Sequence, residues 1–179
     1  MSRLLAALIF MLLSPIYLLI AACIYLEDGR PVHFRQKRVG IHYSFFTLYK
    51  FRSMKRNTPN VATHLLSNPE QYLLKSGKVL RKLSLDELPN MLNIIKGEMS
   101  FVGPRPALYN QDDLMKLRVE AGVHRLKPGI TGWAQINGRD EISNEQKVKL
   151  ESEYLKRKTL GFDLFIVMKT IGAVFSGKG

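Results

Sequence analysis

The chain has 179 residues and a net charge of +12, from 27 Lys and Arg against 15 Asp and Glu. This length suffices for one domain with its own core, and the positive charge favours partners that carry phosphate: nucleic acid, anionic lipid head groups or nucleotides. The single cysteine, Cys23, excludes a disulfide framework, and no Cys/His pattern has the spacing of a zinc site.

Residues 4–26 carry no charge. As one straight helix this segment would be about 34 Å long, enough to cross a bilayer core. Ser14 and Pro15 lie in its middle, however, and proline removes one intrahelical hydrogen bond and bends the helix. Two paths stay open: a kinked transmembrane helix, and a helix that enters and leaves on the same face. Basic residues soon after the segment predict that the downstream domain is cytoplasmic.

A cleaved targeting sequence is the alternative explanation of this segment. Its length and internal proline argue against a secretory signal, whose apolar core is usually shorter. Residues 20–23 have the form of a bacterial lipoprotein cleavage site ending at Cys23. Apolar residues continue past the cysteine, which weakens the lipoprotein interpretation without excluding it.

Two short strands are predicted next. Residues 31–40 alternate apolar and basic side chains, and residues 45–51 are rich in aromatic side chains. The second strand runs into a basic stretch that begins at Lys50 and is either a solvated face or a phosphate clamp. Residues 57–69 are predicted as a loop or partly ordered insertion. Residues 72–83 are predicted to be partly helical, which brings Arg81 close to the acidic pair that follows.

Asp86 and Glu87 are adjacent carboxylates at the predicted start of a short helix that stops at Gly97. If Ser84 is the N-cap, Ser84 and Glu87 form a capping box with only a structural role, but Pro89 then falls inside the helix. If Asp86 is the N-cap, Pro89 lies in the first turn and is tolerated. In both cases the pair lies where helix amides attract an anion. A phosphate there would need a cation such as Mg²⁺ beside the two carboxylates.

Two later stretches combine glycine, proline and arginine. Arg105 lies between two prolines, which favour an extended backbone and hold the guanidinium in one posture. A fixed arginine binds phosphate or carboxylate in a bidentate way, although a rigid turn with a surface arginine has the same pattern. Residues 128–139 contain three glycines, which permit close approach of a ligand, and end at Arg139.

Three further helices are predicted. Residues 110–121 and 147–158 have the charged pattern of surface helices. Residues 160–175 are strongly apolar but too short to span a bilayer, so we expect a core helix or a helix that lies in the membrane interface.

In series, these motifs resemble the monotopic phosphoglycosyl transferases, the bacterial sugar transferases that begin glycan assembly on polyprenol phosphate. Each segment is weak evidence alone, but five segments in the family's order over nearly the whole chain are specific. The matching segments are Ser14-Pro15 and residues 49–54, 85–89, 96–106 and 128–139.

The resemblance implies a re-entrant membrane helix that is broken at Ser14-Pro15. It implies that Asp86 is a nucleophile, which attacks the β-phosphate of a UDP-sugar and releases UMP. Glu87 would bind Mg²⁺ and assist deprotonation of the acceptor, and polyprenol phosphate would then attack the covalent sugar-phosphate intermediate. The basic positions of the family's active site correspond here to Lys50, Arg81, Arg105 and Arg139.

From the resemblance we expect a helix-rich α/β fold that forms one structural unit. Residues 1–29 would be the re-entrant membrane helix, and residues 30–179 a catalytic domain with short strands and a C-terminal interfacial helix. The expected location is the cytoplasmic face of the bacterial inner membrane, with polysaccharide assembly, such as that of lipopolysaccharide or capsule, as the pathway.

The expected partners are a UDP-sugar, undecaprenyl or another polyprenyl phosphate, Mg²⁺ and the phospholipid bilayer, but not nucleic acid; a homo-oligomer is left open. The expected donor is a UDP-linked N-acetylated amino sugar, with UDP-glucose and UDP-galactose as alternatives. A non-catalytic basic scaffold on the membrane is the alternative of a different class. It explains the apolar segments but leaves the Asp-Glu and Arg-Pro motifs as coincidence.

The chain departs from the family in two places. The family usually begins with a basic, aromatic and aspartate stretch before the apolar helix, whereas this sequence opens Met1-Ser2-Arg3-Leu4. We therefore expect the N-terminal anchor to be missing or shortened. The sequence also shows no large additional membrane domain, so we expect a minimal catalytic member. Glu151 stands where related sequences often carry Asp, and no role is predicted for it.

Overall fold

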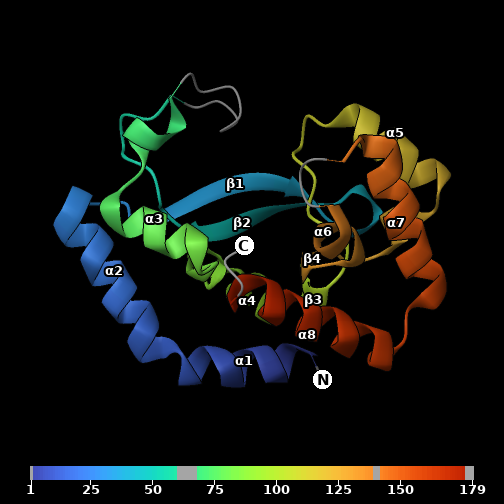
Figure 1. Ribbon diagram of the computed structural model, residues 1–179, viewed down its shortest axis with the longest axis horizontal. Coiled ribbons are helices and arrows are strands. Elements are labelled where there is room, and N and C mark those ends of the chain that lie inside the picture. Colours follow the sequence, from blue (N-terminus) through green and yellow to red (C-terminus); the bar gives the residue numbers. More distant parts are fainter. Residues whose placement is uncertain (1, 60–67, 139–141, 176–179) are drawn as a thin grey trace.

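The computed structural model describes residues 2–59, 68–138 and 142–175. Within these ranges the chain is rich in helix, which confirms the α/β expectation at that level, but the four strands form two separate pairs rather than one small sheet (Figure 1). The helices are α1 (Ser2–Leu12), α2 (Ser14–Asp28), α3 (Lys75–Lys82), α4 (Asn90–Lys96), α5 (Asp112–Glu120), α6 (Trp133–Gly138), α7 (Asn144–Arg157) and α8 (Leu160–Phe175). The strands are β1 (His33–Val39), β2 (Phe45–Phe51), β3 (Ser100–Val102) and β4 (Gly129–Thr131).

Helices α1 and α2 are the two halves of the predicted apolar helix. They are separated by Leu13, directly before Ser14 and Pro15, and their axes differ by 62°. Pro15 lies in the first turn of α2, where its missing amide hydrogen costs no helical bond. Within the described ranges no single helix is long and apolar enough to cross a membrane, and only the bent pair taken together has the required length and composition.

The start of α1 packs against the globular part of the protein (Figure 1). Ala6 is completely buried in a cluster with Phe46 of β2 and Ile94 of α4. The Arg3 guanidinium lies against Gly97, the left-handed residue that ends α4: a Cβ on Gly97 would lie 1.9 Å from Arg3 Nη2. A cation there also suits the negative end of a helix dipole. The N-terminal end of the bent pair therefore belongs to the same unit as α4.

The two predicted strands near the N-terminus form an antiparallel hairpin, in which Phe34 of β1 pairs with Lys50 of β2. Asn93 of α4, which is fully buried, attaches that helix to β2. Its Nδ2 donates to the carbonyl of Thr47 at 2.7 Å, and its Oδ1 accepts from the amide of Tyr49 at 3.2 Å. These bonds place the turn that precedes α4 next to Lys50.

The C-terminal half packs around the parallel β3–β4 pair. Tyr154 of α7 is buried in this core and donates to Asp163 Oδ1 of α8 at 2.6 Å. Helix α8 has the predicted bounds and buries Ile166 completely, while other apolar side chains of the same helix are exposed. Helix α8 is thus a core helix on one face only. The exposed residues are Leu160, Leu164, Phe165, Met168 and Ile171.

Glu151 has a structural partner that the sequence analysis did not predict. Its side chain is 2% exposed and receives two hydrogen bonds from Arg118 of α5, Nε–Oε2 at 2.8 Å and Nη2–Oε1 at 2.5 Å. The same Nη2 donates to the carbonyl of Arg105 at 2.9 Å. This buried ion pair therefore joins α5 to α7 and holds the segment that carries Arg105.

Breaking this ion pair is predicted to destabilise the fold strongly. Glu151→Gln leaves the buried Arg118 guanidinium uncompensated, so we expect the free energy of unfolding to fall by about 3 to 5 kcal/mol. Urea unfolding followed by the fluorescence of the single tryptophan, Trp133, measures the change. Glu153→Gln on the same helix loses an exposed ion pair with Arg157, while the Gln carbonyl oxygen keeps an acceptor for the hydrogen bond from Trp133 Nε1, so we expect it to cost less than about 1 kcal/mol. Equal losses of unfolding free energy in Glu151→Gln and Glu153→Gln would contradict a stabilising role for the buried Arg118–Glu151 ion pair.

Candidate active site

Asp86 and Glu87 lie on a 3-10 turn (Leu85–Glu87), not in the first turn of α4. Both predicted capping arrangements are therefore wrong. Ser84 has a left-handed backbone, with φ of 54°, and its side chain makes no capping hydrogen bond. The physical reason is Pro89: it has no amide hydrogen to give to the carbonyl of Leu85, which instead accepts from Leu88 N at 3.2 Å. The α-helix begins only after the proline, and it stops at Gly97 as predicted.

Glu87 forms the centre of a cluster of charges. Its Oε1 is paired with Lys50 Nζ from β2 and lies 3.9 Å from Arg105 Nη1. The Lys50 and Glu87 side chains are only 18% and 20% exposed, so solvent screens this attraction less than it screens a surface pair. The cluster therefore joins three segments that are far apart in the sequence.

Asp86 is half-buried and has an unusual electrostatic environment. Burial raises the pKa of its carboxyl above the usual value, and the charge of Glu87 adds to the rise, while Lys50 and Arg81 oppose it. A desolvated carboxylate is a stronger nucleophile than a solvated one, and the two cations keep the charged form accessible. The environment of Asp86 thus suits attack on an electrophilic phosphorus.

Three of the four basic residues predicted for the site gather around the acidic pair. Lys50 and Arg105 contact Glu87, as described above. Arg81, in the last turn of α3, donates from Nε to Ser53 Oγ at 2.9 Å and acts electrostatically on Asp86. Arg139, the fourth, lies outside the described residues.

A cleft opens beside this cluster, and two of its polar residues were not predicted as site residues. Arg38 of β1 lines it and donates from Nη1 to the carbonyl of Pro106 at 2.8 Å, next to Arg105. Asn90 also lines it and is 2% exposed; its Oδ1 has no hydrogen-bond partner among the described residues. Arg38 and Lys50 lie on the same face of the hairpin, so a known strand register would have indicated Arg38.

The residues present fit a Mg²⁺ ion that arrives with its substrate better than a preformed metal cage. Within the described residues, no three His, Cys, Asp or Glu side chains are grouped so that they could hold a metal. Asp86 and Glu87 nevertheless provide two adjacent carboxylates. Mg²⁺ usually takes one or two protein carboxylates and fills its other positions with water and substrate phosphates.

Comparison with known proteins gives one family. The family model described as "Bacterial sugar transferase" matches residues 1–177. The "Uncharacterized sugar transferase EpsL" of Bacillus subtilis (strain 168) is 45% identical, over 98% of this chain and 86% of the relative. The "UDP-glucose:undecaprenyl-phosphate glucose-1-phosphate transferase" of Escherichia coli (strain K12) is 40% identical, over 97% of this chain but 39% of the relative.

A third relative acts on a different donor. The "UDP-N-acetylgalactosamine-undecaprenyl-phosphate N-acetylgalactosaminephosphotransferase" of Aeromonas hydrophila is 37% identical, over 100% of this chain and 44% of the relative. The chain thus spans most of the Bacillus subtilis protein and less than half of the other two.

The environment of Asp86 predicts that removing the charge of its carboxylate stabilises the fold at neutral pH. Because its pKa is raised in the folded state, ionised Asp86 lowers the free energy of unfolding at neutral pH, and this cost disappears as the pH falls below the usual aspartate range. We therefore expect Asp86→Asn to raise the thermal unfolding midpoint at pH 7.5, measured in EDTA, and to have no such effect in acid.

Asp28→Asn is the control, for which we expect the opposite change in stability. Burial alone would raise the pKa of Asp28, but its ion pair with Arg52 holds that pKa below the usual value. This variant should lose stability at neutral pH. A lowered midpoint for Asp86→Asn at pH 7.5 would show that the carboxylate stabilises the fold and would refute the desolvated environment.

Proposed function

The chain belongs to the bacterial sugar transferase family and is a transferase; from this premise we propose that it moves a sugar 1-phosphate from a UDP-sugar to polyprenyl phosphate, with Asp86 as the nucleophile. The observation that carries the proposal is the position of Asp86: half-buried, next to Glu87, and in a cluster that supplies Lys50, Arg81 and Arg105. A phosphate-transfer site needs this combination of a nucleophile and several cations.

The proposed reaction has two steps. A carboxylate oxygen of Asp86 forms a bond to the β-phosphorus of the UDP-sugar, and the bond from that phosphorus to the bridging oxygen breaks, so UMP leaves with the electron pair. A phosphate oxygen of polyprenyl phosphate then attacks the same phosphorus and displaces Asp86. A carboxylate nucleophile in this way divides one difficult transfer into two easier ones. The products are UMP and polyprenyl diphosphate sugar.

The surrounding side chains have distinct proposed roles. Lys50, Arg81 and Arg105 orient the diphosphate and stabilise the charge that develops on the phosphoryl oxygens. Glu87 would hold Mg²⁺ and would assist deprotonation of the acceptor. When bound, Mg²⁺ neutralises charge on the diphosphate. Arg139 is assigned to substrate binding by the resemblance alone.

Membrane attachment through a re-entrant helix is part of the proposal. Apolar side chains of α1 and α2 are widely exposed, which is costly in water and favourable in lipid. Arg3, at one end of the bent pair, lies against Gly97, and Asp28, at the other end, pairs with Arg52. Contacts of both ends with one globular unit support a helix that enters and leaves on the cytoplasmic face. The exposed face of α8 supports a second, interfacial attachment.

The donor proposed first is a UDP-linked N-acetylated amino sugar. Relatives of the chain are named for different sugars: the Aeromonas hydrophila protein for N-acetylgalactosamine, the Escherichia coli protein for glucose, and a protein of Salmonella typhimurium for galactose. UDP-glucose and UDP-galactose therefore stay as alternatives for the same reaction, and the experiment below separates them.

The nucleophile is tested by the intact mass of the purified protein after incubation with Mg²⁺ and each of several UDP-sugars, without acceptor. We expect a mass increase of one sugar phosphate with the correct donor, and no increase for Asp86→Asn. Arg105→Gln should still form the adduct but release UMP about a hundredfold more slowly, because one charge-stabilising group is lost.

Asp113→Asn, on the exposed start of α5, is the matched control and should form the adduct at the normal rate. An adduct that persists in Asp86→Asn would assign the nucleophile elsewhere. Polyprenyl phosphate added to the labelled protein should remove the extra mass.

The re-entrant path is tested by labelling cysteines from one side of the membrane. With Cys23 replaced by Ser, a cysteine is placed either at Ser2, the start of α1, or at Thr58, in the globular part of the protein. A re-entrant pair puts both on the same side, so an impermeant maleimide should label both in inside-out vesicles and neither in right-side-out vesicles. Labelling of the two positions from opposite sides would establish a spanning helix instead.

A further inference from the structure

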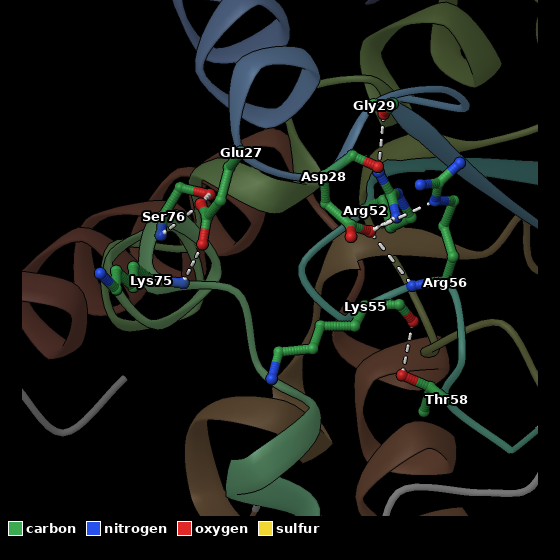
Figure 2. Close-up of polar contacts among 9 residues, drawn as sticks. All are labelled: Glu27, Asp28, Gly29, Arg52, Lys55, Arg56, Thr58, Lys75 and Ser76. Carbon is green, nitrogen blue, oxygen red and sulfur yellow. Dashed lines mark hydrogen bonds and ion pairs between the residues drawn. The ribbon is translucent and has the colours of Figure 1, made fainter.

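The end of α2 supplies the N-terminal cap of a distant helix. Helix α3 has Leu74 at its N-cap position, which makes no side-chain cap, and no acidic residue in its first turn. The carboxylate of Glu27 fills this place: it accepts from Lys75 N at 2.5 Å, Ser76 N at 3.1 Å and Ser76 Oγ at 2.6 Å (Figure 2). Amides that normally bind a local Ser, Thr or Asp are thus bound by a residue of α2.

Asp28 makes a second attachment, to the segment that follows β2. Its Oδ2 is paired with the Arg52 guanidinium and accepts from the amide of Arg56 at 3.2 Å (Figure 2). Arg52 Nη2 also donates to the carbonyl of Gly29 at 2.8 Å. Because the side chains of Arg52 and Asp28 are only 8% and 23% exposed, solvent screens their ion pair less than it screens a surface pair, and the pair attaches the end of α2 to the backbone around Arg52.

Both attachments converge on Ser53. The carbonyl of Ser53 accepts from Leu74 N at 3.0 Å, and α3 crosses it so closely that a Cβ on Gly77 would lie 2.1 Å from that oxygen. The hydroxyl of Ser53 receives the hydrogen bond from Arg81 Nε. Glu27 thus fixes one end of α3, Asp28 fixes the segment against which α3 packs, and Arg81 lies at the other end.

We propose that Glu27 and Asp28 are positioning residues, which use the end of α2 to hold Arg81 at the correct place beside Asp86. Rotation of the eight-residue α3 by a few degrees about its N-terminus would move the Arg81 guanidinium relative to the carboxylate, and errors of about 1 Å in such groups reduce rates markedly. The inference rests on the proposed function, because it assumes that Arg81 contacts the donor diphosphate. It implies that α2 orients an active-site cation as well as attaching the protein to lipid.

The charge states support the proposal. Burial alone would raise the pKa of Glu27, but the hydrogen bonds from Ser76 and Lys75 lower it below the usual value. Glu27 is therefore ionised at neutral pH, as a charge-assisted cap at the positive end of a helix dipole requires.

The test measures UDP affinity of the full-length protein by calorimetry, in a cycle with Arg81→Gln. We expect Glu27→Gln to weaken UDP binding about tenfold in the wild-type background and less than about twofold when Arg81 is already replaced, since coupled residues are not additive. The proposal would be overturned if Glu27→Gln weakened UDP binding equally in the wild-type and Arg81→Gln backgrounds, or if it did not weaken binding in the wild-type background. A wild-type protein that binds no UDP would overturn the proposed function, and this inference with it.

Two further variants separate positioning from stability. Glu70→Gln removes an exposed carboxylate that also pairs with α3, through Lys78 at 3.7 Å, and should leave UDP affinity unchanged. Ser76→Asp added to Glu27→Gln restores an anion in the first turn of α3 without a connection to α2. It should recover the thermal unfolding midpoint but not UDP affinity. Full recovery of affinity would show that Glu27 is only a helix cap.

Discussion

The ion pair between Lys50 and Glu87 is the contact on which the site depends. A carboxylate that is largely removed from water needs a cation beside it, because an unpaired buried charge costs several kcal/mol. Lys50 belongs to a hairpin strand and Glu87 to the turn before α4, so their attraction adds to the hydrogen bonds of Asn93 that hold α4 against β2. Asp86 shares this environment by being next in sequence, and its raised pKa follows from the same burial.

Proline controls the geometry at both ends of this arrangement. Pro15 lies just after the break in the N-terminal helices, and Pro89 prevents α4 from starting at the acidic pair. At Pro89 the missing amide hydrogen removes one helical bond, whereas Pro15 lies in the first turn of α2, directly after the change of direction at Leu13, and costs none. The first break lets α1 return to the globular part of the protein. The second leaves Asp86 and Glu87 on a half-buried 3-10 turn rather than within a regular α-helix.

Much of the local structure was predictable, because short-range chemistry decides it. The break at Ser14-Pro15, the two hairpin strands and the stop at Gly97 follow from proline, side-chain alternation and a left-handed glycine. The predicted capping box is wrong for a local reason as well: Ser84 adopts a left-handed backbone, and Pro89 has no amide hydrogen for the carbonyl of Leu85. The predicted loop at residues 57–69 lies largely outside the described residues.

The sequence by itself determined which residues carry charge, where helices break and which five segments resemble a family of sugar transferases, because these depend on residue type and spacing along the chain. Only the tertiary structure decided which charges meet. Glu151 pairs with Arg118, Glu27 caps a helix 48 residues away, and Arg38 joins the cleft. The physical reason is that an ion pair or cap is chosen by distance in space, and that distance is set by packing of the whole chain.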